Sequence, residues 1–246
     1  MNVIFIADAH LRNPDDLNYR TMLRFLREFP ANVDTLVIAG DFFEFWLGDS
    51  PEAFPHYKPA LDELEILTRK GVKLLFFEGN HDFHLGKYFR TAFNAEVFPE
   101  KAEIIIDGKR TFICHGDLIN RYDYGYLALR FIFRNPLTRM LAKIVPSAVP
   151  AFIARKLGKH SKEKHKTVEA KWDYKQLVRK FAAARFKDGF DLVVTAHYHR
   201  PLFESSEGKS LLALGDWITQ FSYGQWLDGE LTLKTYQPEQ PDKAEG

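Results

Sequence analysis

The stretch FFEGNHDFH, residues 76–84, decides the fold and raises the functional question. It completes the apolar run of residues 73–77, which then stops at a glycine. Asn80, His81 and Asp82 follow, so an amide, an imidazole and a carboxylate stand in sequence behind a hydrophobic strand. Polar side chains at such a strand end predict that this edge of the sheet holds a ligand.

Strand patterns and helix patterns alternate before this stretch. Apolar runs at residues 3–7, 35–39 and 73–77 are typical of buried strands, and residues 17–29 and 59–70 carry leucines and phenylalanines at helical spacing. This order of strand, helix, strand, helix, strand predicts parallel neighbours joined by right-handed crossovers. We therefore expect an α/β fold whose chemical residues lie just after each strand, because ligands of such sheets gather at the carboxyl ends.

The second half of the chain is less regular. Residues 103–106 and 110–114 predict a hairpin around the turn Asp107-Gly108, and residues 191–196 resume the core. A chain of 246 residues that is 46% hydrophobic can bury one sizeable core, so we expect one domain with an insertion. The expected parts are a core of residues 1–120 and 189–237, an inserted helical cap of residues 121–188, and a flexible tail of residues 238–246.

Four further polar clusters stand at positions equivalent to Asn80. In an extended segment, residues two apart point to the same face, so both side chains of an Asp-x-His or His-x-His pair can bind one metal ion. Taken singly, an aspartate at a strand end is more often a turn residue, and a lone histidine is more often a satisfied polar group. Together with the cluster at Asn80 they make five in one chain, which favours a shared site. The four further clusters are Asp8 with His10, Asp41 after a glycine, His115, and His197 with His199.

The chemistry of these side chains indicates the type of site. Imidazole, carboxylate and amide oxygen without thiolate suit Mn²⁺, with Fe²⁺ or Zn²⁺ as alternatives, and argue against a structural zinc site. Cys114 should point to the opposite face from His115, so we expect it to pack in the core. Seven ligands are too many for one ion. Two ions with a bridging carboxylate would use them all and would form a clamp for displacement at phosphorus.

The order DAH, GD, GNHD, HGD and HYH resembles that of the calcineurin-like metallophosphoesterases and runs from Asp8 to His199. The resemblance implies a four-layer α/β/β/α sandwich of two mixed sheets with an inserted helical cap. It also implies that His81 faces the scissile phosphate, where it stabilises charge or protonates the leaving oxygen, and that Asp82 orients His81. It assigns Asp8, His10, Asp41 and His199 to one ion, and Asp41, Asn80, His115 and His197 to the second.

Longer motifs are similar to those of the UDP-2,3-diacylglucosamine diphosphatases. They are GDFFEFWLGD at residues 40–49, HGDL at residues 115–118 with Asp123 and Tyr124 soon after, and LGDW at residues 214–217. The resemblance implies cleavage of a nucleotide-linked glycolipid to UMP and 2,3-diacylglucosamine 1-phosphate, under a helical cap that receives the acyl chains. The substrate contacts that it implies are Asp123, Tyr126, Ser161 and His165.

The chain departs from these diphosphatases at two places. His81 stands where that family usually has arginine, and a serine–asparagine–lysine pattern of the cap is matched at Ser161 but not at His165 and Val168. His81 restores the arrangement of the wider superfamily. A phosphodiesterase or phosphomonoesterase that acts on another amphiphile therefore stays an alternative.

Positive charge is concentrated in residues 121–190, which carry 17 Lys and Arg against 5 Asp and Glu. The same segment is rich in aliphatic side chains, a combination that suits lipid tails and anionic head groups. We therefore expect contact with an anionic membrane surface. The alternatives are a solvated helical face, an ordinary helix pair that packs on the core, and a nuclease that grips single-stranded nucleic acid. Nucleic acid is the weaker alternative, because the basic residues do not surround obvious stacking aromatics.

The compartment follows from the cysteine content and the apolar runs. A lone cysteine, Cys114, excludes an internal disulfide framework and favours a reducing cytoplasm. Residues 1–7 are too short for the apolar region of a secretory signal and lack a basic start. Charges and prolines interrupt the apolar stretches 126–133 and 140–154, so neither predicts a membrane span. We expect a cytoplasmic protein, bound peripherally to the cytoplasmic membrane face.

Overall fold

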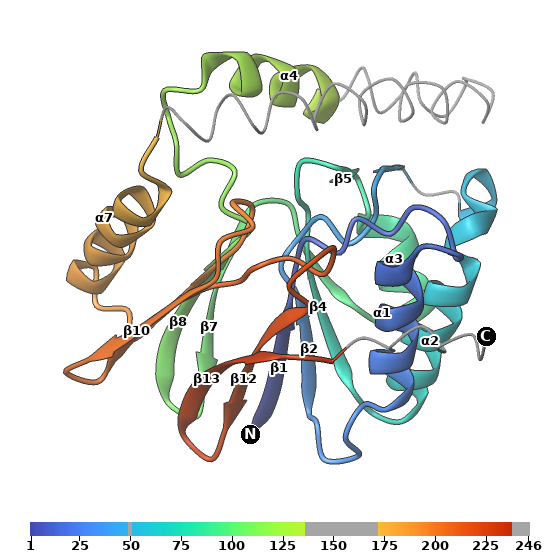
Figure 1. The fold of residues 1–246 in the computed structure, drawn as a ribbon, viewed down its shortest axis with the longest axis horizontal. Helices are drawn as coiled ribbons and strands as arrows, with labels where there is room; N and C mark the ends of the chain where they lie inside the picture. Colours follow the sequence, from blue (N-terminus) through green and yellow to red (C-terminus); the bar gives the residue numbers. More distant parts are fainter. Residues whose placement is uncertain (49–50, 136–171, 238–246) are drawn as a thin grey trace, which may run out of the picture.

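Two stacked β-sheets form the centre of the computed structural model, which describes residues 1–48, 51–135 and 172–237 (Figure 1). The first sheet has the order β13-β12-β1-β2-β4-β6. Its middle is parallel, since β1, β2, β4 and β6 pair in parallel, and β12 and β13 add an antiparallel edge. The strands are β1 (Asn2–Ile6), β2 (Thr35–Ile38), β4 (Lys73–Phe77), β6 (Glu96–Phe98), β12 (Ser222–Leu227) and β13 (Glu230–Thr235).

The second sheet has the order β10-β11-β9-β8-β7 and is also mixed. Strand β9 pairs in parallel with β8 and β11, whereas β7 and β10 pair antiparallel at the edges. The expected hairpin around Asp107 is the β7–β8 connection. The strands are β7 (Lys101–Ile106), β8 (Lys109–Cys114), β9 (Leu192–Thr195), β10 (Leu202–Ser206) and β11 (Lys209–Ala213), and a separate two-stranded sheet joins β3 (Trp46–Leu47) to β5 (Asp82–Phe83).

Strand β1 shows why the two sheets stack. Its residues are buried on both faces: Ile4 and Ile6 belong to the core under the helices, and Val3 and Phe5 belong to the core between the sheets. A strand covered on both sides reads as a continuous apolar run, which is the pattern of residues 3–7 in the sequence. The alternation of side chains along the strand then feeds two separate cores.

Three helices cover the outer face of the first sheet (Figure 1). Helix α1 (Leu17–Arg27) buries Met22, Phe25 and Leu26 at helical spacing. Helix α2 (Lys58–Arg69) ends where Gly71 adopts a φ of 93°, the left-handed conformation that ends many helices. The third helix is α3 (Gly86–Phe93), and two single turns of 3₁₀ helix, η1 (Pro51–Ala53) and η2 (Pro55–Tyr57), precede α2.

Helix α7 (Tyr174–Lys187) covers the outer face of the second sheet and completes four layers. Val178 and Ala182, one turn apart, pack against Phe112, Val193 and Leu211 of that sheet. The expected α/β/β/α sandwich of two mixed sheets is therefore confirmed. The packing places α7 in the sandwich, although its residues fall within the range 121–188 that the sequence assigned to a cap.

Helix α4 (Tyr124–Arg134) lies on the side of the molecule where the parallel strands end (Figure 1). Two of its arginines, one turn apart, attach it to the loops beneath. Arg130 Nε donates to Asp117 at 3.0 Å, and Arg134 lies 3.4 Å from Glu78. Of the cap residues singled out from the sequence, Tyr126 belongs to this helix, whereas Ser161 and His165 lie outside the described residues, as does the expected tail 238–246.

Candidate metal centre

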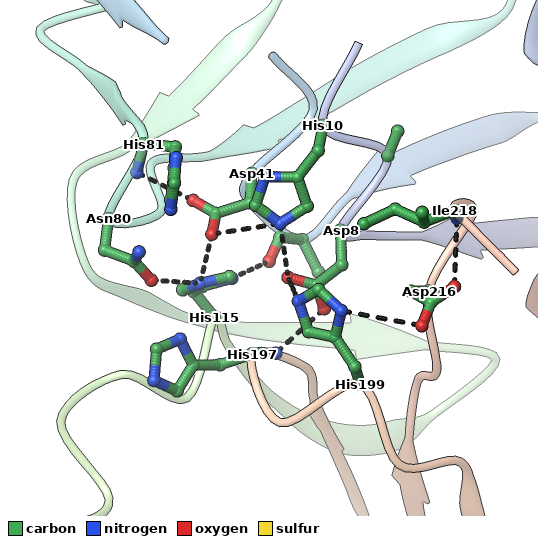
Figure 2. Close-up of polar contacts among 12 residues, drawn as sticks. Asp8, His10, Asp41, Asn80, His81, His115, His197, His199, Asp216 and Ile218 are labelled. Atoms are coloured by element: carbon green, nitrogen blue, oxygen red, sulfur yellow. Dashed lines mark hydrogen bonds and ion pairs between the residues drawn. The ribbon is translucent and has the colours of Figure 1, made fainter. Parts of the chain in front are cut away.

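Side chains from the ends of both sheets converge on one point (Figure 2). Asp8 and His10 follow β1, and His199 follows β9, yet the ligand atoms of all three lie within 4.8 Å of one another. His199 Nε2 lies 3.6 Å from Asp8 Oδ1, and His10 Nε2 lies 3.9 Å from the same oxygen. The first candidate metal position is therefore built across the two sheets.

A second group lies beside the first. Asp41, His115 and His197 bring their ligand atoms within 4.8 Å of one another. Asp41 Oδ2 lies 3.4 Å from His115 Nε2 and 3.7 Å from His10 Nε2, so this one oxygen faces both groups. Asn80 Oδ1 is 3.1 Å from His115 Nε2 and joins the second group. All seven side chains expected from the sequence as ligands thus lie together.

At five of these seven positions the backbone is left-handed, not extended. Asp8, His10, Asp41, His197 and His199 have φ values of 51°, 45°, 52°, 76° and 52°. Residues other than glycine adopt such values at a cost of order 1–3 kcal/mol, and these residues cluster at functional sites. The expectation that each pair points the same way because its segment is extended was therefore wrong. The pairs converge through successive sharp turns after the strands.

Two glycines allow the loops to approach closely. A Cβ atom at Gly79 would lie 2.0 Å from Asp41 Oδ1, and one at Gly40 would lie 2.5 Å from His115 Nδ1. Gly40 also has a φ of 98°, which favours glycine on its own account. The glycines in the motifs GD and GNHD are thus required by the contact between ligand loops.

The donor atoms fit a divalent cation. Asp8 Oδ1 and His10 Nε2 are buried and make no hydrogen bond, although buried polar atoms are nearly always paired. Both face the same space beside Asp41 (Figure 2). A set of carboxylate, imidazole and amide donors suits Mn²⁺, Fe²⁺ or Zn²⁺, and the thiol of Cys114 is buried in the core under α7.

Burial and the nearby carboxylates shift the pKa values of this cluster in opposite directions. Burial raises the pKa of Asp8 to about 6. Burial alone would lower the pKa of His115 and His199, but the nearby Asp41 and Asp8 outweigh it and raise these pKa values to about 10 and about 9. Burial, followed by the charge of His115, lowers the pKa of His197 to about 3. The buried carboxylates therefore stabilise cations at this point.

The family profile of calcineurin-like phosphoesterases matches residues 1–201, most of the chain. The chain belongs to the calcineurin-like phosphoesterase family. Curated relatives of this phosphoesterase are named UDP-2,3-diacylglucosamine hydrolase. The protein from Vibrio cholerae is 30% identical over 90% of this chain and 93% of its own length. Proteins from Shigella dysenteriae and Escherichia coli are 32% and 31% identical, each over 90% of this chain and 93% of their own length.

Asp82 has a different place in this phosphoesterase from the one expected. It was expected to orient His81, but it is buried and accepts backbone N–H groups of Asp41, Phe42 and Gly79 at 3.2, 2.9 and 2.6 Å. The His81 ring is held elsewhere, since its Nδ1 lies 2.8 Å from the carbonyl oxygen of Glu44. Because that oxygen can only accept, Nδ1 carries a proton. Asp82 therefore holds the ligand loops together, and the backbone carbonyl of Glu44, not Asp82, orients the His81 ring.

Sequence reasoning missed two carboxylates behind the imidazoles of the first group. Glu44 Oε2 lies 3.6 Å from His10 Nδ1, and Asp216 Oδ2 lies 3.5 Å from His199 Nδ1. Asp216 follows β11 by three residues, so the strand-end rule that found the ligands also applies to it. It stands in the LGDW motif, which was used for family resemblance alone.

The expected substrate contacts are only partly placed by the described residues. Asp123 is half-buried at the start of α4, where its carbonyl oxygen accepts the N–H of Leu127 at 2.9 Å. Tyr126 lies one turn further along. The roles of both in substrate binding stay predictions.

Asp41→Asn should remove both metal ions, because one Asp41 oxygen faces both candidate groups. Asparagine tolerates the left-handed backbone, and its amide oxygen can still accept the His81 N–H that Asp41 Oδ1 binds at 2.8 Å. The fold should therefore survive. The measurement is Mn²⁺ content by elemental analysis after dialysis, with circular dichroism as the check of folding.

The matched control is Asp62→Asn, which alters an exposed carboxylate paired with Lys58. It should keep the metal content of the wild type. An Asp41→Asn protein that retains two ions and normal turnover would contradict the bridging position.

Proposed function

We propose that this phosphoesterase is a metal-dependent hydrolase that cleaves UDP-2,3-diacylglucosamine to UMP and 2,3-diacylglucosamine 1-phosphate. The observation that carries the proposal is the carboxylate of Asp41 between two groups of metal-binding side chains. Relatives that cover 90% of the chain bear the name of this activity, which supports the choice of substrate. The sequence motifs around residues 40–49 and 214–217 support the same choice.

Two divalent ions, Mn²⁺ in our proposal, complete the site. Asp8, His10, Asp41 and His199 would hold one ion, and Asp41, Asn80, His115 and His197 would hold the other. Such a pair of ions would acidify a water molecule for attack on phosphorus and offset the charge of the phosphoryl oxygens. The chain itself contributes a rigid, buried frame for this chemistry, since Asp8 and His115 are fully buried.

His81 is the proposed catalytic side chain. Its Nδ1 donates to the backbone carbonyl oxygen of Glu44, which fixes the orientation of the ring, and its backbone N–H donates to Asp41 Oδ1. The ring lies edge-on to His10 with centroids 4.6 Å apart, which places it beside the first group (Figure 2). From there Nε2 would donate a hydrogen bond or a proton to the leaving oxygen.

Helix α4 is the proposed contact with lipid. It exposes Tyr124, Phe131 and Ile132 at 72%, 72% and 57% of their surface. None of the helices in the described part of the chain has the length and hydropathy of a membrane span. An exposed aromatic and aliphatic face within a basic segment suits an anionic membrane surface. We therefore propose a cytoplasmic enzyme that binds the membrane peripherally through this face.

With Mn²⁺ present, UDP-2,3-diacylglucosamine should be hydrolysed faster than a simple phosphodiester, a phosphomonoester or a single-stranded oligonucleotide. The measurement is release of UMP against release of nitrophenol and of cleaved oligonucleotide under one set of conditions.

His81 stands where the diphosphatases usually have arginine, and this observation favours a second candidate, a phosphodiesterase for another amphiphile. Preference for the simple phosphodiester would select that candidate, and preference for the oligonucleotide would select a nuclease.

His81→Ala should lower turnover by roughly 10²–10⁴-fold with metal content preserved, the range for loss of a positioned acid or base. The comparison is kcat and Mn²⁺ content for wild type and variant. His56→Ala is the control, because His56 is a half-buried histidine outside the metal-binding groups that the described part of the chain contains. Loss of an ion from His81→Ala would instead make His81 a ligand.

Binding to anionic vesicles should weaken as salt rises, because charge attraction at an exposed surface is screened within about 8–10 Å near physiological ionic strength. Flotation with phosphatidylglycerol vesicles measures it. Phe131→Glu should reduce the bound fraction, whereas Ile105→Glu, at a residue 61% exposed on β7, should not. Absence of binding at every salt concentration would leave α4 without a role at the membrane.

A further inference from the structure

Asp216 stands behind a metal-binding histidine but belongs to none of the candidate ligand groups found among the described residues. It is 5% exposed and lies in the loop between β11 and β12. Figure 2 shows its carboxylate on the far side of the His199 ring from Asp8. His199 Nε2 is 3.6 Å from Asp8 Oδ1, and His199 Nδ1 is 3.5 Å from Asp216 Oδ2. The imidazole is therefore placed between two carboxylates.

The hydrogen bonds to the Asp216 carboxylate are concentrated on one of its two oxygens. Oδ1 accepts from the N–H groups of Ile218, Thr219 and Gln220 at 2.9, 2.7 and 3.2 Å, and from the Thr219 hydroxyl at 3.2 Å. This oxygen is saturated by its own turn, so the carboxylate cannot rotate without breaking several hydrogen bonds. Oδ2 is thereby held toward His199.

The same turn also holds the backbone on either side of the site. Gln220 Nε2 donates to the carbonyl oxygen of His199 at 2.8 Å. The N–H of Trp217 donates to the carbonyl oxygen of Asp8 at 3.1 Å. These contacts join the β11–β12 loop to the backbone of Asp8 and of His199, two facing ligands of the first group. They also support the left-handed backbone of His199.

We propose that Asp216 is a positioning residue, which keeps the proton of His199 on Nδ1 so that the lone pair of Nε2 faces the first metal position. The proposal rests on the metal assignment of the proposed function. A carboxylate can only accept a hydrogen bond, so a lone pair on Nδ1 would face an anion, and the tautomer with N–H at that atom is favoured. Carboxylates that accept from metal-binding histidines orient the ring and make it a stronger ligand.

Asp216→Asn tests this tautomer preference directly. The amide oxygen of asparagine can replace Oδ1 in the turn, which places the NH₂ group opposite His199. A donor at that point favours a lone pair on Nδ1 and a proton on Nε2, the wrong arrangement for ligation. One of the two Mn²⁺ ions should then bind roughly 10–100-fold more weakly, the usual effect of losing such a partner, while the other changes little. Titration with Mn²⁺ alone, followed by electron paramagnetic resonance, measures both.

Thr219→Val is the matched control. It removes a hydroxyl that also contacts Asp216, but it leaves Oδ2 and the backbone donors in place. Its two Mn²⁺ affinities should stay within about threefold of the wild type, since the carboxylate keeps its orientation. Turnover of Asp216→Asn at saturating substrate should recover as Mn²⁺ is raised, because a positioning defect is overcome by mass action. A loss of activity that excess Mn²⁺ does not restore would overturn the proposal.

A measurement on the wild type keeps the proposal testable if Asp216→Asn does not fold. In the Zn²⁺-loaded protein, nitrogen-15 correlation spectra should show a proton on His199 Nδ1 that exchanges slowly with water. Ligation through Nδ1, or equal Mn²⁺ affinities in wild type and Asp216→Asn, would overturn the role of Asp216. A wild type that fails to bind two ions would instead contradict the proposed function.

Discussion

Buried carboxylates that accept backbone N–H groups from neighbouring loops hold this site together. Asp82 binds the N–H groups of Asp41, Phe42 and Gly79, while Asp8 accepts the N–H of His197 at 2.9 Å. An ionised carboxylate is expensive to bury unless it is paired, so each loop is fixed where it compensates the charge of another. The left-handed turns of the ligands persist because these contacts over-determine them.

This arrangement separates the tasks of the acidic residues. Asp8 and Asp41 face the metal positions, Asp82 joins loops, and Glu44 and Asp216 stand behind histidines. The burial of Asp82 and the charge of Asp41 raise the pKa of Asp82 to about 7, even though the N–H groups of Gly79 and Phe42 and the charge of His115 oppose that shift. Carboxylate side chains thus serve as metal ligands, as acceptors that join loops, or as partners that orient histidines, according to what each one contacts.

Much of the fold could be predicted from the sequence because strand ends carry a local signal. The apolar runs before Asp8, Asp41 and Asn80 predicted parallel strands, and the carboxyl-end rule brought their polar residues together. The turn geometry could not be predicted, since left-handed aspartate and histidine leave no pattern in the sequence. Asp216 obeys the same strand-end rule, but its motif was interpreted only as a family resemblance, and α7 was assigned to the cap because a helical pattern does not reveal which sheet it covers.

Two of the candidate metal groups take side chains from both sheets: Asp8 and His10 from the first sheet face His199 from the second, and Asp41 faces His115 and His197. A cation shared in this way would act as a crosslink between the two halves of the sandwich, much as a disulfide does in a small secreted domain. Sliding of one sheet against the other would strain both coordination shells at once. Occupancy of the centre would therefore resist movement of one sheet against the other.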